Sequence, residues 1–260
     1  MLYLSLAFAP VLIILIYIYV RDKFNREPFW LLFLSVLGGM LSVIPVLLVG
    51  IVTELIAPLF QGIQLAFYHA FIQAGFVEEL FKLLVVLILV WGSRHFDERF
   101  DGIVYAVFVS MGFALVENIM YVFGGGLQVG LLRMVTAVPA HAIFGVAMGY
   151  YLGLAKFNPW KRSTYIVLAF IVPWLLHGFY DFAIMAGYSW LLIVFIFYLI
   201  FMYIYGFRKI RELARLKVKP VENDPEIQTN GTEIDEISIQ NTMNSENNLN
   251  INNDGTTEQS

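Results

Sequence analysis

The sequence predicts an all-α integral membrane protein, a polytopic bundle of about seven transmembrane helices with a disordered acidic C-terminal tail. Three observations indicate this class. Of the 260 residues, 59% are hydrophobic and only 14% are charged, whereas about 25% charged residues are typical of soluble domains. The hydrophobic residues form runs of roughly 17–25, the length that crosses about 30 Å of hydrocarbon. Residues 220–260 are rich in Asn, Glu, Thr and Ser without periodicity, which is typical of disorder.

Seven apolar runs fit the length of a membrane span. They cover residues 2–20, 30–52, 67–91, 102–123, 131–155, 164–186 and 189–206. The first could be a secretory signal, but no positive segment precedes it and no small-residue cleavage site follows it. Basic residues come directly after it, so we expect an uncleaved span with its N-terminus outside the cell.

Lys and Arg residues alternate from one connection to the next. Lys and Arg occur in segments 21–26, 94–99, 156–162 and 208–219. The connections between the second and third, the fourth and fifth, and the sixth and seventh spans contain no Lys or Arg. Basic loops remain in the cytoplasm. We therefore expect a multi-pass protein of the cell membrane with an extracytoplasmic N-terminus and a cytoplasmic C-terminus.

The chain divides by composition into three regions. Residues 1–210 form a helical transmembrane domain, 211–219 a basic juxtamembrane segment, and 220–260 the acidic, Asn-rich tail. The tail holds nine of the 20 acidic residues and no Lys or Arg, so the remainder carries about +5. No cysteine is present, which excludes disulfides, thiolate metal sites and a Cys nucleophile. We expect the lipid bilayer as a partner and no nucleic acid.

The stretch "GFVEELFKLLVV", residues 75–86, places three ionisable side chains in an apolar run. Each charge at a helix centre costs about 2.5–3.5 kcal/mol on insertion scales, and such residues are usually functional. Lys82 follows Glu78 by four residues and Glu79 by three, so it can pair with either along one helix. It cannot fully neutralise both, so one glutamate faces another group and could act as a general base. A purely structural ion pair is the alternative.

Three further spans contain ionisable groups. "GFALVENIMY" contains Phe113, Glu117 and Asn118, and "VPAHAIFG" contains a histidine, His141, among small residues. Glu117 could instead pair with Arg133, and His141 could serve only in helix packing, because small residues also indicate close helix contacts.

"HGFYDF" places His177 and Asp181 one helical turn apart, where the carboxylate can fix the imidazole tautomer. With the predicted topology, the polar groups of all four spans lie roughly 8–18 Å below the outer surface. The sequence therefore predicts one polar site in the outer half of the bilayer.

Several known catalytic mechanisms of intramembrane hydrolysis are excluded. The sequence has no H-E-x-x-H zinc motif and no G-x-S-G serine motif, and Asp181 is the only aspartate within the spans. A Glu and His site remains, in which a glutamate activates water and histidines stabilise the oxyanion. The same residues could hold a metal such as zinc without thiolates. The spacing leaves both options open.

These motifs resemble those of a known family. "EELFK" at 78–82, "FALVE" at 113–117 and "HGFYD" at 177–181 are similar to the E-E-x-x-K, F-x-x-x-E and H-x-x-x-D signatures of the PrsW family of intramembrane proteases. "DGIVYA" at 101–106 and "PAHAIFG" at 139–145 also resemble that family, and all matches follow its order within about residues 1–210. The related CAAX-prenyl and bacteriocin-processing proteases usually have His where this chain has Glu117.

The resemblance implies an intramembrane endopeptidase that performs site-1 cleavage of a membrane-anchored anti-sigma factor in envelope-stress signalling. The expected catalytic residues are Glu78, Glu79, His141, His177 and Glu117. The expected supporting residues are Lys82, Asp181, Asn118 and Phe113. If a metal takes part, zinc is the candidate and its expected ligands are Glu79, Glu117, His141 and His177. Two alternatives are a proton- or ion-coupled transporter, against which no inverted repeat is found, and a non-enzymatic binding or immunity protein.

Overall fold

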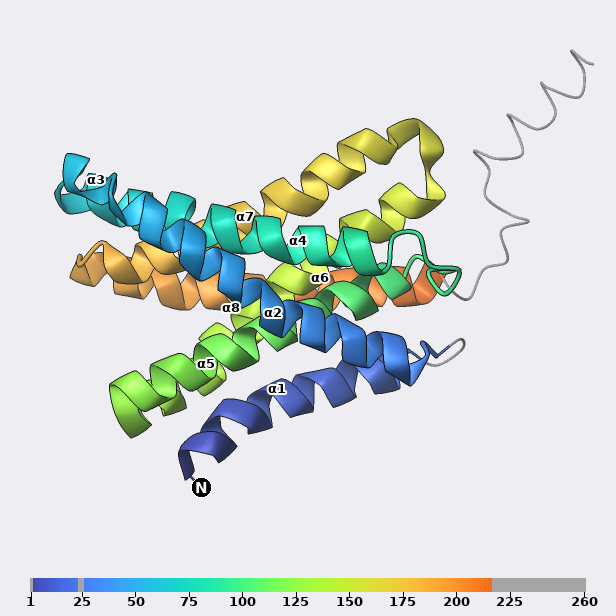
Figure 1. Cartoon of the computed structure of the whole chain (residues 1–260), viewed down its shortest axis with the longest axis horizontal. Coiled ribbons are helices and arrows are strands. Elements are labelled where there is room, and N and C mark those ends of the chain that lie inside the picture. The colour runs from blue at the N-terminus through green and yellow to red at the C-terminus, as the bar shows by residue number, and fades with distance from the viewer. Residues whose placement is uncertain (1, 23–25, 217–260) are drawn as a thin grey trace, which may run out of the picture. The chain divides into compact units, whose positions relative to one another are not determined.

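The structure, a computed structural model, describes residues 2–22 and 26–216, and every regular element in these residues is helical (Figure 1). The acidic tail predicted for 220–260, with Lys217 and Lys219 of the basic segment, lies outside the described residues. The elements are α1 (Leu2–Arg21), α2 (Phe29–Glu54), η1 (Ala57–Leu59), α3 (Gly62–Phe67), η2 (Tyr68–Phe76), α4 (Val77–Leu89), α5 (Asp101–Val135), α6 (Ala137–Phe157), η3 (Pro159–Lys161), α7 (Arg162–Met185) and α8 (Ser189–Leu216).

Five helical segments are long and apolar enough to cross a membrane, which confirms the predicted class of helical membrane protein. They are Tyr3–Arg21, Phe29–Glu54, Asp101–Phe157, Pro159–Met185 and Ser189–Arg215. The longest contains two helices, α5 and α6, which are separated only by Thr136.

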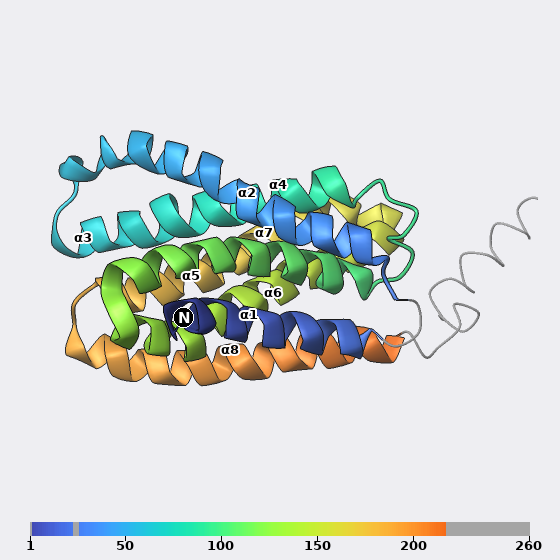
Figure 2. The same ribbon diagram turned by 60° about the horizontal axis from the view of Figure 1, so that its bottom comes forward.

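Two predicted spans differ from the observed helices. The span predicted at 67–91 is a helical path that begins at Gly62 and consists of α3, the π-helix η2 and α4. The span predicted at 131–155 begins later, because α6 starts at Ala137. The segment 124–130, which lies between two of the predicted spans, is helical except at Gly126, whose φ of 77° breaks α5. A positive φ favours glycine, and the chain reverses there so that 127–135 lies against the preceding part of α5 (Figure 2).

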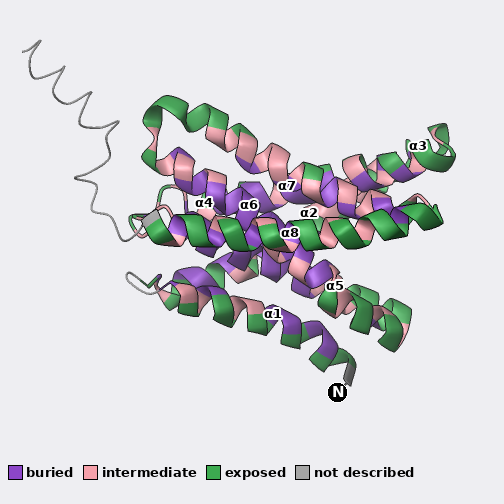
Figure 3. Ribbon diagram, turned by 180° about the vertical axis from the view of Figure 1, so that it is seen from behind, coloured by how far each residue is buried: buried purple, intermediate pink, exposed green. Residues whose placement is uncertain are grey.

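Helices α5 and α6 form the centre of the bundle. In an apolar 18-residue window within 101–157, 78% of the residues are buried, against 22–33% in the corresponding windows of the other four segments. Figure 3 shows this contrast, with α8 and α1 largely exposed. Small residues allow the two central helices to approach closely: a Cβ added to Gly149 would lie 2.2 Å from the carbonyl oxygen of Gly102. The exposed side chains of the outer helices are mostly large and apolar, as a lipid-facing surface requires.

The packing around α5 and α6 determines where the polar spans meet. Helix α2 packs against α5, and α7 packs against both α6 and η2. Helix α4 contacts α2, α5 and α7. Helix α4 is therefore packed among three helices, of which α7 carries His177. His141 lies on α6, which packs against both α5 and α7.

Candidate active site

Helices η2 and α7 approach closely just before the Glu78–Glu79 pair. A Cβ added to Gly75 would lie 3.1 Å from the backbone nitrogen of Gly178, and a Cβ added to Gly178 would lie 2.3 Å from the ring of Phe71, so this contact favours glycine at both positions. The Nε1–H of Trp174 donates a 2.7 Å hydrogen bond to the carbonyl oxygen of Phe71 in η2. A π-helix leaves carbonyls displaced from the α-helical pattern and is frequent at functional sites. This contact places the start of α4 beside the middle of α7.

Lys82 lies at the centre of the cluster and is fully buried. Its Nζ donates to Glu78 Oε2 at 3.2 Å and to Glu79 Oε1 at 2.9 Å. The sequence predicted a pair with one glutamate, whereas the structure shows both pairs. Lys82 Nζ also lies 3.1 Å from His141 Nδ1 and 4.1 Å from the centre of the Phe113 ring. The contact with Phe113 is a cation–π interaction, which accounts for an aromatic residue in this position.

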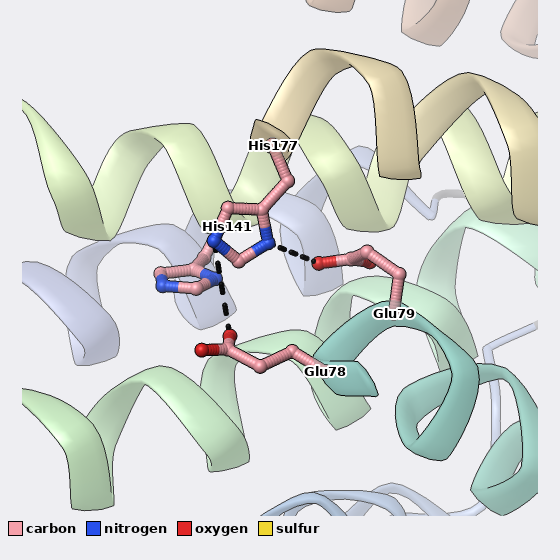
Figure 4. A group of neighbouring side chains, drawn as sticks. All are labelled: Glu78, Glu79, His141 and His177. Carbon is pink, nitrogen blue, oxygen red and sulfur yellow. Dashed lines mark hydrogen bonds and ion pairs between the residues drawn. The ribbon is translucent and has the colours of Figure 1, made fainter. Parts of the chain in front are cut away.

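His177 connects the glutamate pair to α7. Its Nδ1 lies 2.9 Å from Glu79 Oε1, and its Nε2 lies 3.9 Å from Glu78 Oε2 (Figure 4). The same Nε2 lies 3.2 Å from Asp181 Oδ2. The sequence predicted the contact with Asp181, but the second imidazole nitrogen is not free, because it faces Glu79. The ring of Phe144 on α6 stacks on His177 at 4.8 Å with an angle of 16° between the planes. Phe144 thereby restricts the imidazole, and the sequence did not single it out.

His141 connects the cluster to α5. Its Nε2 lies 2.8 Å from Glu117 Oε2, while its Nδ1 faces Lys82. An ammonium group can only donate, so Nδ1 accepts and the proton of the neutral ring is on Nε2, directed at Glu117. Arg133 Nη2 donates to the same Glu117 oxygen at 2.8 Å, which confirms the ion pair considered from the sequence. Glu117 therefore orients His141 from outside the central group.

Asn118 lies further from the centre. Its Oδ1 accepts from Arg133 Nε at 3.1 Å, and its Nδ2 donates to the carbonyl oxygens of Leu6 and Ala7 at 3.3 and 3.4 Å. These bonds connect α5 to α1 and hold Arg133 in place. Among the described residues, Asn118 is thus connected to the site through its hydrogen bond with Arg133.

Four buried side chains could hold a metal ion. Ligand atoms of Glu78, Glu79, His141 and His177 all lie within 4.8 Å of one another. Carboxylate oxygens and imidazole nitrogens suit zinc. Glu117, expected among the ligands, is not in this group, and Glu78 is.

Two further observations fit a divalent cation. Glu79 Oε2 is buried and has no hydrogen-bond partner within the described part of the chain. Such an atom normally has a partner. The cluster also contains four carboxylates, those of Glu78, Glu79, Glu117 and Asp181, but only two permanent cations, Lys82 and Arg133. With neutral histidines this leaves about two negative charges, which a divalent ion would balance.

Glu78 also borders a cavity of about 700 Å³ between α2 and the α3–η2 segment. Glu54, His69 and Gln73 line the same cavity, and none of them was among the candidate site residues predicted from the sequence. A signal was present, because His69 and Gln73 are polar residues within an apolar run. Their partner Glu54 is distant in sequence, so only the fold reveals the grouping.

Comparisons with known proteins agree with this site. A family model described as "PrsW family intramembrane metalloprotease" matches residues 27–206. The chain is similar to "Protease PrsW" of Clostridioides difficile (strain 630), with 39% identity over 76% of this chain and 85% of the relative. It is 36% identical to "Protease PrsW" of Bacillus subtilis (strain 168) over 84% of this chain and 98% of the relative. "Protease PrsW" of Oceanobacillus iheyensis is 40% identical, over 72% and 84%.

No solved structure shows a significant match to the chain. The family model and the relatives each cover well over half of the sequence, and the buried Glu and His cluster lies within the matched residues. This decides between the enzyme and the transporter or immunity protein considered from the sequence. The chain is a multi-pass membrane peptidase and belongs to the PrsW family of intramembrane metalloproteases.

Proposed function

We propose that this peptidase cleaves a membrane-anchored protein in the outer half of the bilayer, as the site-1 step that acts on an anti-sigma factor in envelope-stress signalling. One observation supports hydrolysis at this site: Glu78, Glu79, His141 and His177 lie close together, and Glu78 borders a cavity. The anti-sigma factor follows from the motif resemblance alone.

We infer seven spans, formed by α1, α2, the α3–η2–α4 path, α5, α6, α7 and α8. Figure 1 supports this path, since the α1–α2, α4–α5 and α6–α7 connections and the end of α8 lie at one end of the bundle. These are the basic segments of the chain, so this end is cytoplasmic by the positive-inside rule. The N-terminus is then extracytoplasmic, and residues 1–210 act as the protease domain.

Glu78 is the general base in this proposal. Of the glutamate pair, Glu78 borders the cavity, and 11% of its side chain is exposed, while Glu79 has no exposed surface. Water in the cavity can therefore reach Glu78, and proton abstraction by a positioned carboxylate contributes about 10²–10⁴-fold.

The histidines hold and polarise the reacting groups. Asp181 orients His177, and Glu117, held by Arg133, orients His141. Lys82 balances part of the charge of the glutamate pair. From the group of four, Glu79, His141 and His177 would hold a divalent metal such as zinc, which when bound supplies Lewis-acid polarisation of water and the scissile carbonyl, and Glu78 stays available as the base.

A cleavage assay with a single-span reporter substrate tests the proposal. Glu78→Gln and Glu79→Gln are nearly isosteric and remove a buried charge, so both variants should accumulate normally. We expect cleavage to fall at least about a hundredfold in each. Glu212→Gln is the matched control, because Glu212 lies near the end of α8 and pairs with Lys209 outside the cluster. A chelator should abolish cleavage by the parent protein, and added zinc should restore it.

If both site variants accumulate and cleave at the parent rate, the glutamates are structural and the mechanism is wrong. If cleavage persists in the chelator, the metal is not required.

A further inference from the structure

A second polar cluster lines the cavity beside Glu78. Gln73 Nε2 donates to Glu54 Oε2 at 3.0 Å and to the carbonyl oxygen of Gly50 at 3.2 Å. Gln73 Oε1 contacts His69 Nδ1. None of these side chains contacts the catalytic group through a hydrogen bond that the structure records. They share only the cavity with it.

The cavity extends from the catalytic glutamate to this second cluster. The C-terminal half of α2 forms one wall and the α3–η2 segment the other, and the two elements lie beside each other in Figure 2. The rest of the lining on these two walls is mainly apolar and includes Val46, Leu47, Ile51 and Leu65. A volume of about 700 Å³ is within the range of about 300–1,000 Å³ typical of ligand sites.

A protease within the membrane must expose the backbone of its substrate. In a helix the scissile carbonyl and the neighbouring N–H groups are already hydrogen-bonded, so the segment must unwind before water can attack. An unwound backbone in hydrocarbon leaves polar groups unsatisfied at a cost of several kcal/mol each, and it is tolerated only where it lines a polar or water-filled site. The binding site therefore needs side chains that hydrogen-bond to a backbone.

The wall of this cavity provides such side chains. Glu54 is exposed, and His69 and Gln73 are half-buried, so solvent or a ligand can reach them. Between them they offer carboxylate, imidazole and amide groups, which can accept from N–H and donate to C=O. Charged and polar groups in membrane spans are rare and usually mark a functional path.

We infer that this cavity holds the unwound segment of the membrane-anchored substrate beside Glu78, with Glu54, His69 and Gln73 pairing with its backbone. The apolar wall takes the side chains of the substrate's membrane segment. This inference rests on the proposed function, because it uses Glu78 as the group that acts on the scissile bond.

Gly50 offers a direct way to obstruct the cavity. It lines the cavity, and a Cβ added there meets no atom within 4 Å, so the side chain of Gly50→Leu begins in open space and adds volume to the cavity wall. Gly124→Leu is the matched control, since a Cβ at this exposed position of α5 also meets nothing and the residue does not line the cavity. We expect Gly50→Leu to slow reporter cleavage at least about tenfold at unchanged accumulation. The control should cleave at the parent rate.

The polar cluster is tested by Gln73→Met, which keeps an unbranched side chain but removes the amide. We expect KM to rise at least about tenfold while kcat changes less, because the lost contacts bind the substrate and do not take part in the chemical step. Gln64→Met, at an exposed position of α3, should change neither constant. A lowered kcat with unchanged KM would contradict a binding role.

Disulfide trapping identifies the occupant, because the chain has no cysteine of its own. Gly50→Cys in a Glu78→Gln background should form a disulfide with a reporter that carries one Cys near the cleaved bond, and Gly124→Cys should not. If neither position forms a disulfide, or both do so equally, the cavity holds lipid or solvent and the inference is overturned.

Different variants test the proposed mechanism and the proposed substrate site. Normal cleavage by Glu78→Gln overturns the proposed mechanism, whereas normal cleavage by Gly50→Leu overturns only the substrate site.

Discussion

Among the described residues, Lys82 is the only lysine or arginine in contact with both members of the glutamate pair, so Lys82→Met tests how the cluster tolerates its charges. Methionine retains the length and flexibility of the lysine stem but carries no charge. The variant leaves Glu79, which has no exposed surface, with His177 as its remaining partner.

The loss of stability expected for Lys82→Met follows from the burial of its two ion pairs. Removing one partner of a buried ion pair costs about 3–5 kcal/mol, because a charge is left without compensation. The pair with Glu78 contributes less, since the cavity admits water that screens it. We expect Lys82→Met to lower the free energy of unfolding by about 3–4 kcal/mol, mainly through Glu79.

The assay is unfolding of the purified protein by SDS titration in mixed micelles, after chelator treatment. Lys209→Met is the matched control, because Lys209 and Glu212 have the same i,i+3 spacing at 3.0 Å, but 48% of the Glu212 side chain is exposed. The control should lose less than about 1 kcal/mol. Adding Glu79→Gln to Lys82→Met should restore part of the loss, because one buried carboxylate is then removed.

A bound divalent ion should also replace part of the missing charge of Lys82, so zinc should stabilise Lys82→Met more than the parent. If Lys82→Met is no less stable than Lys209→Met, the buried pair of Lys82 with Glu79 does not stabilise the fold as expected.

Three further predictions concern other parts of the fold. Arg133→Gln should lower kcat for the single-span reporter by about tenfold, because Glu117 then no longer holds His141 in its orientation. Arg133→Lys should restore part of kcat. A change in KM alone would contradict this orienting role. Gly149→Ala should reduce stability by about 1–3 kcal/mol in the SDS titration, since its Cβ would lie 2.2 Å from a backbone oxygen; unchanged stability would refute the close α5–α6 contact. A topology reporter fused after Lys219 should read as cytoplasmic and one inserted at Gly125 as extracytoplasmic; the reverse would overturn the proposed orientation.

The membrane class and the individual polar motifs were predictable from the sequence. Long apolar runs identify spans because length and hydropathy are local properties. Lys82 lies within reach of Glu78 and Glu79 for the same reason, since helical spacing alone brings them together. The contact between His177 and Asp181 has the same origin. Each of these is set within four residues of one helix.

The local backbone departures were not predictable in the same way. The π-helix η2 continues directly into α4, and nothing in its sequence distinguishes it from an α-helix. The break at Gly126 lies in a glycine-rich stretch that reads as a linker, yet the chain turns back there as a helix. Both depend on packing against neighbouring elements, because tertiary contacts override local preference.

Which polar groups belong together was decided only by the tertiary structure. The contact of His177 with Glu79 joins residues 98 positions apart, and that of Glu54 with Gln73 crosses 19. Helical periodicity carries no information at such separations, so the sequence could suggest a common depth for the polar residues but not their partners. The fold also decided that Glu78 borders the cavity while Glu79 is enclosed, because the direction of each side chain has meaning only once α2, α5 and α7 are packed around α4.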